Sequence, residues 1–261
     1  MIADSLTYFN QGVGSRDVVL GASFAGKPTA AVPLGQGVKA WIAHEGGVGK
    51  EQAGIGGLPL SQQFGIPAAA IATMSARLSD GQSLLKGTIS HLNEAASSLG
   101  VQVGQTGEQA ARLMLNAPPG KAADVKGMID NEIHQLESNE RGGIYAVWSL
   151  MLVKDKRPND VFCVASHSAR VMADYAHPVM PKGVFANDAG MGMDNSGIDG
   201  LPVLNDLGVA AVAVAAMSAR IGEPMSTYDD GVCSAVNAIA RSAGVHEGMS
   251  VKHAARLLLD A

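Results

Sequence analysis

Short apolar segments alternate along the chain with longer segments of mixed polarity, as they do in α/β proteins. The segments 17–23, 38–43 and 66–73 are rich in Val, Ile and Ala and end in small or polar residues. Uninterrupted apolar runs of this length are typical of parallel strands that helices cover on both faces. The pattern therefore predicts parallel sheets with helices on both faces and right-handed crossovers between the strands.

The same pattern occurs twice. The segment 41–60, WIAHEGGVGKEQAGIGGLPL, has a counterpart in 185–203, FANDAGMGMDNSGIDGLPV, and an offset of 143 residues pairs His44 with Asn187. The same offset pairs the two MSAR tetrapeptides, 74–77 and 217–220. We interpret the chain as an internal duplication related by pseudo-two-fold symmetry. The predicted divisions are a first α/β repeat at 1–117, a helical connector at 118–143 and a second repeat at 144–261.

Each predicted repeat ends in helical patterns. Apolar residues at helical spacing predict an amphipathic helix over 85–99, and a second one over 232–243. A last helix is predicted to begin at Thr106, whose TGEQ is typical of a capping box, and at Ser250. Here the offset is 144, which implies one inserted residue. Histidines on these predicted helices, such as His91, are expected to have surface roles.

Composition narrows the partners and the location. The 261 residues are 47% hydrophobic and 16% charged with a net charge of −5, and Lys and Arg are scattered rather than clustered. This distribution argues against nucleic acid or an anionic membrane and favours a small-molecule ligand. The two cysteines lie in apolar segments, the N-terminus lacks the pattern of a signal peptide, and the longest apolar run is too short for a membrane span. We expect a cytoplasmic protein that forms homo-oligomers through its weakly charged surface.

Polar side chains follow three consecutive strands in each repeat. Parallel strands bring such groups to one edge of a sheet, where ligands of α/β proteins bind. These candidates are Ser23, His44, Glu45, Ser75 and Arg77 in the first repeat, and Ser166, Asn187, Asp188, Ser218 and Arg220 in the second. The two edges could form one shared cleft or two separate ones.

Glycine-rich loops follow the second strand of each repeat. Gly47 and Gly49, with Gly190 and Gly192, would let the backbone approach a ligand closely. Backbone N–H groups before a helix can bind an anion, and Lys50 or a neighbouring arginine could add a charge-assisted clamp. The expected ligand is a small anion or a polar compound with carbonyl oxygens. A purely structural interpretation stays open, in which the repeated glycines and arginines preserve turns, caps and helix packing.

The pattern favours an enzyme that uses general acid and base groups on a small anionic or carbonyl-containing metabolite. Asp188 or Glu45 would act as base, and His44 or Lys50 as acid, with arginine and loop amides stabilising negative charge. Hydrolysis is favoured, while racemase, isomerase or lyase chemistry would also fit. Among the candidates, Asp188 is where we place the chemistry, because it differs from its counterpart in the first repeat.

Other chemistries have weaker support. A nucleophilic serine at Ser23 or Ser166 lacks the G-x-S-x-G motif. No cofactor is predicted, although the acids around the two loops would suit Mg²⁺ or Mn²⁺. GGVGK resembles part of a phosphate loop without its full spacing, so nucleotide binding is a further alternative. The main non-enzymatic alternative is a small-ligand-binding or regulatory module.

Overall fold

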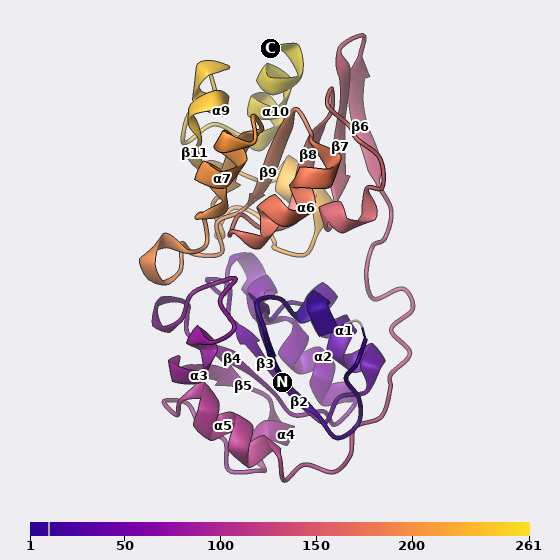
Figure 1. Ribbon diagram of the computed structural model, residues 1–261, viewed down its shortest axis with the longest axis vertical. Helices are drawn as coiled ribbons and strands as arrows, with labels where there is room; N and C mark the ends of the chain where they lie inside the picture. The colour runs from indigo at the N-terminus through magenta and orange to yellow at the C-terminus, as the bar shows by residue number, and fades with distance from the viewer. Residues whose placement is uncertain (10) are drawn as a thin grey trace. The chain divides into compact units, whose positions relative to one another are not determined.

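The computed structural model describes residues 1–9 and 11–261, which form two α/β units (Figure 1). Unit 1 contains Met1–Val48, Gln52–Ile129 and Gly192–Asp194, and unit 2 contains Gly49–Glu51, Asp130–Met191 and Asn195–Ala261. Each unit has its own sheet, with five strands in unit 1 and six in unit 2. Both sheets are mixed and mostly parallel, so the predicted α/β class is confirmed.

The strands of unit 1 follow one another in sequence order across the sheet, β1-β2-β3-β4-β5. Only the last pair, β4 with β5, is antiparallel. The strands are β1 (Ile2–Ala3), β2 (Val18–Phe24), β3 (Ala40–His44), β4 (Ala68–Ile71) and β5 (Ile89–Leu92). The helices are α1 (Lys27–Gln36), α2 (Gly57–Gln63), α3 (Ser83–Lys86), α4 (Glu94–Ser97) and α5 (Gly107–Met114).

Unit 2 repeats this arrangement and adds one strand, in the order β11-β10-β9-β8-β7-β6. The outer pairs β6–β7 and β10–β11 are antiparallel. Its strands are β6 (His134–Asn139), β7 (Gly142–Val147), β8 (Val161–His167), β9 (Gly183–Asn187), β10 (Ala210–Val214) and β11 (Cys233–Val236). Its helices are α6 (Val171–Val179), α7 (Gly200–Asp206), α8 (Pro224–Asp229), α9 (Ala238–Ser242) and α10 (Val251–Asp260). Short 3₁₀ helices complete the chain at η1 (Leu6–Phe9), η2 (Lys50–Ile55), η3 (Thr73–Ser75), η4 (Leu150–Leu152) and η5 (Met193–Asn195).

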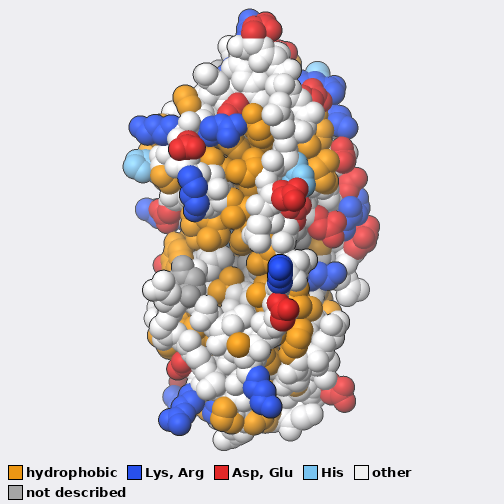
Figure 2. Space-filling view, turned by 90° about the vertical axis from the view of Figure 1, so that its right-hand side faces the viewer, with side chains coloured by type: hydrophobic (Ala, Val, Ile, Leu, Met, Phe, Trp, Pro, Cys, Tyr) orange, Lys and Arg blue, Asp and Glu red, His pale blue; other side chains and the backbone are white. Residues whose placement is uncertain are grey.

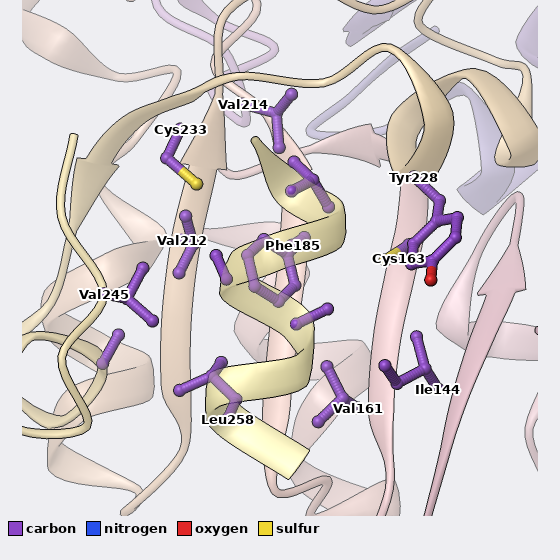
Figure 3. Close-up of a cluster of buried hydrophobic side chains, with 14 of the residues drawn as sticks. Ile144, Val161, Cys163, Phe185, Val212, Val214, Tyr228, Cys233, Val245 and Leu258 are labelled. Carbon is purple, nitrogen blue, oxygen red and sulfur yellow. The ribbon is translucent and has the colours of Figure 1, made fainter. Parts of the chain in front are cut away.

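Both sheets bury apolar side chains on both faces. In unit 2, Phe185 packs on one face among residues of α10 and the neighbouring strands, as Figure 3 shows. Alternate residues of the same strands, such as Val184 and Ala186, belong to a second cluster that includes residues of α6 and α7. Unit 1 has the same division, with Trp41 in one cluster and Ile42 in the other. Burial on both faces explains the uninterrupted apolar runs in the sequence.

Three helical predictions are wrong. The segment predicted as one helix over 85–99 instead contains the strand β5 between the short helices α3 and α4, and 232–243 likewise contains β11 before α9. A short edge strand with apolar residues cannot be distinguished from a helix by spacing alone. The connector at 118–143 contains no helix among its residues, all of which the structure describes, and β6 with the start of β7 occupies its second half.

On the face drawn in Figure 2, Lys and Arg side chains are interspersed with Asp and Glu. None of the helices in the described part of the chain combines the length and apolar character that crossing a bilayer requires.

Candidate functional site

His44 and Asn187 end the equivalent strands β3 and β9, and their side chains make equivalent hydrogen bonds. Nδ1 of His44 accepts the Gly46 N–H at 3.0 Å, and Nε2 lies 3.1 Å from the Thr73 carbonyl and 3.2 Å from that of Ala76. This assigns the proton to Nε2. Asn187 uses its Oδ1 and Nδ2 in the same way.

Oδ1 of Asn187 accepts the Ala189 N–H at 2.8 Å, and its Nδ2 donates to the Ala219 carbonyl at 3.3 Å. Ala189 and Ala219 are the counterparts of Gly46 and Ala76 at the offset of 143. Burial lowers the pKa of His44 despite the hydrogen bonds to carbonyls that oppose it, so the ring is neutral at pH 7. His44 therefore holds its loop in the role of a buried amide, and it is not placed as a general acid.

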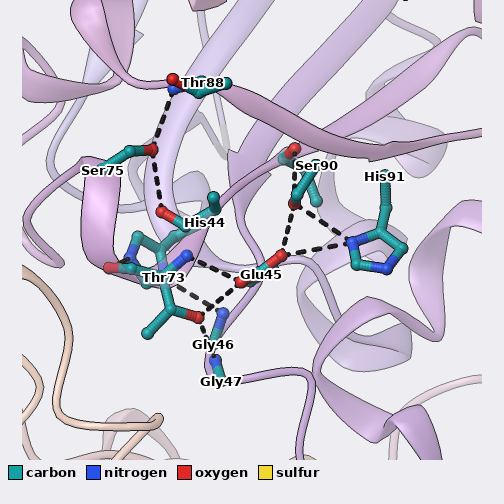
Figure 4. A network of polar contacts seen from close by, with 11 residues as sticks. His44, Glu45, Gly46, Gly47, Thr73, Ser75, Thr88, Ser90 and His91 are labelled. Carbon is teal, nitrogen blue, oxygen red and sulfur yellow. Dashed lines mark hydrogen bonds and ion pairs between the residues drawn. The ribbon is translucent and has the colours of Figure 1, made fainter. Parts of the chain in front are cut away.

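Glu45 is the centre of a polar network in unit 1 (Figure 4). Its Oε1 accepts hydrogen bonds from the N–H and the hydroxyl of Thr73, both at 2.7 Å. Its Oε2 accepts a short hydrogen bond from Ser90 and lies 3.2 Å from Nδ1 of His91. Burial alone would raise the pKa of Glu45, but the hydrogen bonds from Ser90 and Thr73 and the nearby His91 outweigh it and lower this pKa. Glu45 is consequently a carboxylate at neutral pH.

A register shift in the sheet brings two consecutive side chains to Glu45. In the antiparallel pair of β4 and β5, Ala70 faces His91 and Ile71 faces Ile89, which leaves Ser90 as an extra residue. Such a bulge re-aims side chains that would otherwise alternate between faces. It allows both Ser90 and His91 to contact the same carboxylate.

His91 joins this network although its sequence pattern pointed to a helix surface. Its side chain is 41% exposed, and Figure 4 shows Nδ1 directed at Glu45 and Ser90 with the other ring nitrogen directed away. The helical spacing of residues 85–99 misplaces His91, because these residues include the strand β5. One difference between the repeats could have drawn attention to this position. At the offset of 144, Ser90 matches Ser234, whereas His91 matches Ala235, so the histidine occurs only in the first repeat.

Asp188 directly follows β9, at the position equivalent to Glu45 after β3, and its shorter side chain makes a smaller network. Oδ1 of Asp188 accepts the N–H groups of Gly190 and Ala216, at 2.9 and 3.0 Å. Ala216 is the counterpart of Thr73, so the carboxylate of Asp188 takes the place of both Glu45 and the Thr73 hydroxyl, which accepts the Gly47 N–H at 3.0 Å.

The glycine loops close largely on themselves. Gly47, Gly49, Gly190 and Gly192 all have positive φ, between 71° and 75°, which glycine adopts without strain. The N–H groups of Gly47 and Gly190 are already bonded to Thr73 and Asp188. Within the described residues these two amides therefore satisfy the protein's own acceptors rather than pointing to an anion.

Three of the predicted serines, Ser23, Ser75 and Ser218, make hydrogen bonds within the fold. Ser75 and Ser218 have equivalent roles, because each hydroxyl donates to a carbonyl three residues earlier and accepts an N–H from the segment before the last strand. Ser23 is buried against Ser5 and accepts the Leu6 N–H at 2.8 Å. Ser166 in β8 is half-buried.

The predicted cations are paired with acids. Within unit 1, Arg77 contacts Asp194 at 3.0 Å. Within unit 2, Arg220 contacts Glu223 at 2.6 Å and Glu51 at 3.1 Å, and Lys50 contacts Asp230 at 3.0 Å. The carboxylates nearby neutralise these side chains, which the sequence had suggested as clamps for an anionic ligand.

No group of three or more His, Cys, Asp or Glu side chains that could hold a metal ion occurs within residues 1–9 and 11–261. Comparisons of the chain with models of protein families, with curated proteins and with solved structures find no match.

Proposed function

We propose that the protein is an enzyme that acts on a small anionic or carbonyl-containing metabolite by general acid–base catalysis, with hydrolysis the favoured reaction. His91 is the proposed general base, and Glu45 is the residue that positions it. The observation that carries this proposal is the hydrogen bond between Glu45 Oε2 and His91 Nδ1, with the opposite edge of the ring directed away from the carboxylate.

The chemistry follows from the protonation states. Since Glu45 is ionised, it favours the proton on Nδ1 of His91 and leaves the Nε2 lone pair available. Nε2 then takes a proton from a water molecule as the water oxygen attacks the substrate carbonyl. The imidazolium that results is stabilised by Glu45, and it returns the proton to the leaving group. Racemisation or elimination would use the same base on a C–H proton.

A non-catalytic ligand-binding module is the second candidate. The hydrogen bonds that Glu45 already accepts within the fold favour this candidate, because a fully bonded carboxylate is also a common structural element. This function would need Glu45 only to fix the loop, and it would need no base at His91.

The test is a turnover assay on a panel of small esters, amides and lactones, with a parallel assay of α-proton exchange on small carboxylates. The key variant is His91→Gln, which can still donate to Glu45 but cannot accept a proton. The matched control is His253→Gln, an exposed histidine in α10. We expect His91→Gln to lower kcat by about 10²- to 10⁴-fold with an unchanged Tm, and the control to keep full activity.

Glu45→Gln separates positioning from a structural role. The amide would present an N–H to Nδ1 of His91 and so favour the wrong tautomer, which should lower kcat more than it raises KM. Normal turnover by His91→Gln would refute the proposed base. Absence of turnover by the wild-type protein over the whole panel would favour the binding module.

A further inference from the structure

A cavity of about 390 Å³ lies in unit 2 between α7, β11 and the first residue of α9. Its walls are mainly apolar and include Ile198, Leu201, Pro202 and Val236. The volume falls in the range of sites for small organic ligands. We propose that this cavity is a binding site for a small amphipathic amine, with the apolar body between α7 and β11 and the ammonium group at Asp206. This site does not involve the residues of the proposed catalytic network.

The two repeats differ at the cavity in a consistent direction. Nine residues line it, and four of them are identical to their counterparts in unit 1. The other five are all smaller than their counterparts: Asn205 for Gln62, Asp206 for Gln63, Ala235 for His91, Val236 for Leu92 and Ala238 for Glu94. Random substitution would make some side chains larger and others smaller. Because all five substituted side chains around this cavity are smaller, we infer that the cavity has a binding role.

The backbone frame around these positions is the same in both units. Asn237 accepts the N–H groups of Ala211 and Ala240 and donates to the Val209 carbonyl at 2.8 Å. Asn93 makes the three equivalent bonds in unit 1. Because these bonds fix the spacing between β10, β11 and α9, the smaller side chains leave a cavity instead of a collapsed contact.

The helix α7 is fixed to the same frame. Oδ1 of Asn205 accepts the Ile239 N–H at 3.3 Å, and Gln62 makes the equivalent bond to the N–H of Ala95 in unit 1. Both walls of the cavity are thus held by hydrogen bonds that have counterparts in unit 1, and the shorter side chain of Asn205 retains its own.

The charge at the rim selects the head group. Asp206 is exposed, lines the cavity and has no cationic partner among the described residues. No Lys or Arg lines the cavity. An ammonium group near Asp206 would gain a charge-assisted hydrogen bond, while a carboxylate there would be repelled.

The experiment compares three probes with the same body, 4-phenylbutylamine, 4-phenylbutan-1-ol and 4-phenylbutanoate, by saturation-transfer NMR and chemical-shift titration of the full chain. We expect the amine to bind best, the alcohol more weakly and the acid least, with shifts at Ala235 and Ala238. The variant Ala235→His/Val236→Leu restores the residues of unit 1, which the same fold accommodates there, and should weaken amine binding about tenfold or more. The control Leu92→Val makes the reverse of the Val236→Leu change at the equivalent position of unit 1, and it should leave amine binding unchanged.

Asp206→Asn tests the head group separately. It should weaken binding of the amine about two- to fivefold, as expected for an exposed ion pair, and leave the alcohol unchanged. Absence of binding by all three probes at millimolar concentration would overturn the proposal. Equal binding of amine and acid would overturn the assigned ligand class, and binding unaffected by the filling variant would overturn the assigned cavity.

Discussion

Replacement of His44 tests whether its imidazole acts as a buried amide. His44 is fully buried and bonds the Gly46 N–H and the carbonyls of Thr73 and Ala76. His44→Ala leaves these groups without partners and creates a cavity. Because each unsatisfied buried group costs about 1–3 kcal/mol, we expect a loss of about 3 kcal/mol or more. His44→Asn should retain the bonds to Gly46 and Ala76, as Asn187 does in unit 2, and should cost about 1 kcal/mol.

The pH dependence of the free energy of unfolding provides a second, independent test of His44. The pKa of His44 is lowered in the folded protein, so below about pH 6.5 the unfolded chain takes up a proton that the folded chain does not. The wild-type protein therefore loses stability as pH falls, by up to about 1.4 kcal/mol per pH unit from this residue. His44→Asn lacks this contribution, so its stability should approach that of the wild type between pH 7.5 and 5.5.

The assay is urea unfolding followed by tryptophan fluorescence. The chain has two tryptophans, one in each unit, so a Trp148→Phe background makes Trp41 a reporter of unit 1. Free energies of unfolding are compared at pH 7.5, 6.5 and 5.5 for wild type, His44→Asn and His44→Ala. Equal destabilisation by Asn and Ala would refute the amide-like role. Parallel pH curves for wild type and His44→Asn would refute the neutral buried imidazole.

Two further predictions concern buried asparagines in each unit and an ion pair in unit 2. Asn93→Ala removes four buried hydrogen bonds and Asn237→Ala removes three, so each should destabilise its own unit by about 2–4 kcal/mol, measured by urea unfolding. A loss below about 1 kcal/mol in either variant would contradict their equivalence. In unit 2, hydrogen bonds from Arg256, aided by Tyr228, lower the pKa of Glu137 to about 2. Its contribution to stability is complete above about pH 4.5 and is lost as pH falls toward 2, so Glu137→Gln should flatten acid unfolding followed by circular dichroism, and an unchanged acid profile would argue against it.

Much of the fold could be predicted from local sequence. The apolar runs predicted the central parallel strands, such as β4 and β10, because burial on both faces imposes an uninterrupted pattern. The capping box at Thr106 was also predicted, since the Thr106 and Gln109 side chains act within one turn of helix. The repeat in the sequence is matched by equivalent hydrogen bonds in the two units, as an internal duplication would produce.

The edge strands β5 and β11 could not be predicted in this way. Each is four residues long and lies between short helices, so its apolar residues follow helical and strand spacing equally well. This error concealed the candidate site, because His91 reaches Glu45 only from a strand that pairs with β4. The sequence alone placed the glycine loops and the acids after β3 and β9, where short-range order is sufficient.

The sequence by itself determined the α/β class, the central strands and the polar residues at their carboxyl ends, because all of these depend on neighbours within a few residues. Only the tertiary structure decided what those polar residues do. It assigned His44 and Asn187 to the same hydrogen bonds, paired Arg77 and Arg220 with acids, and brought His91 to Glu45 through the register shift at Ser90. These contacts join residues far apart in the chain, and the direction of a side chain in a bulged strand is set by its pairing partner rather than by its own sequence.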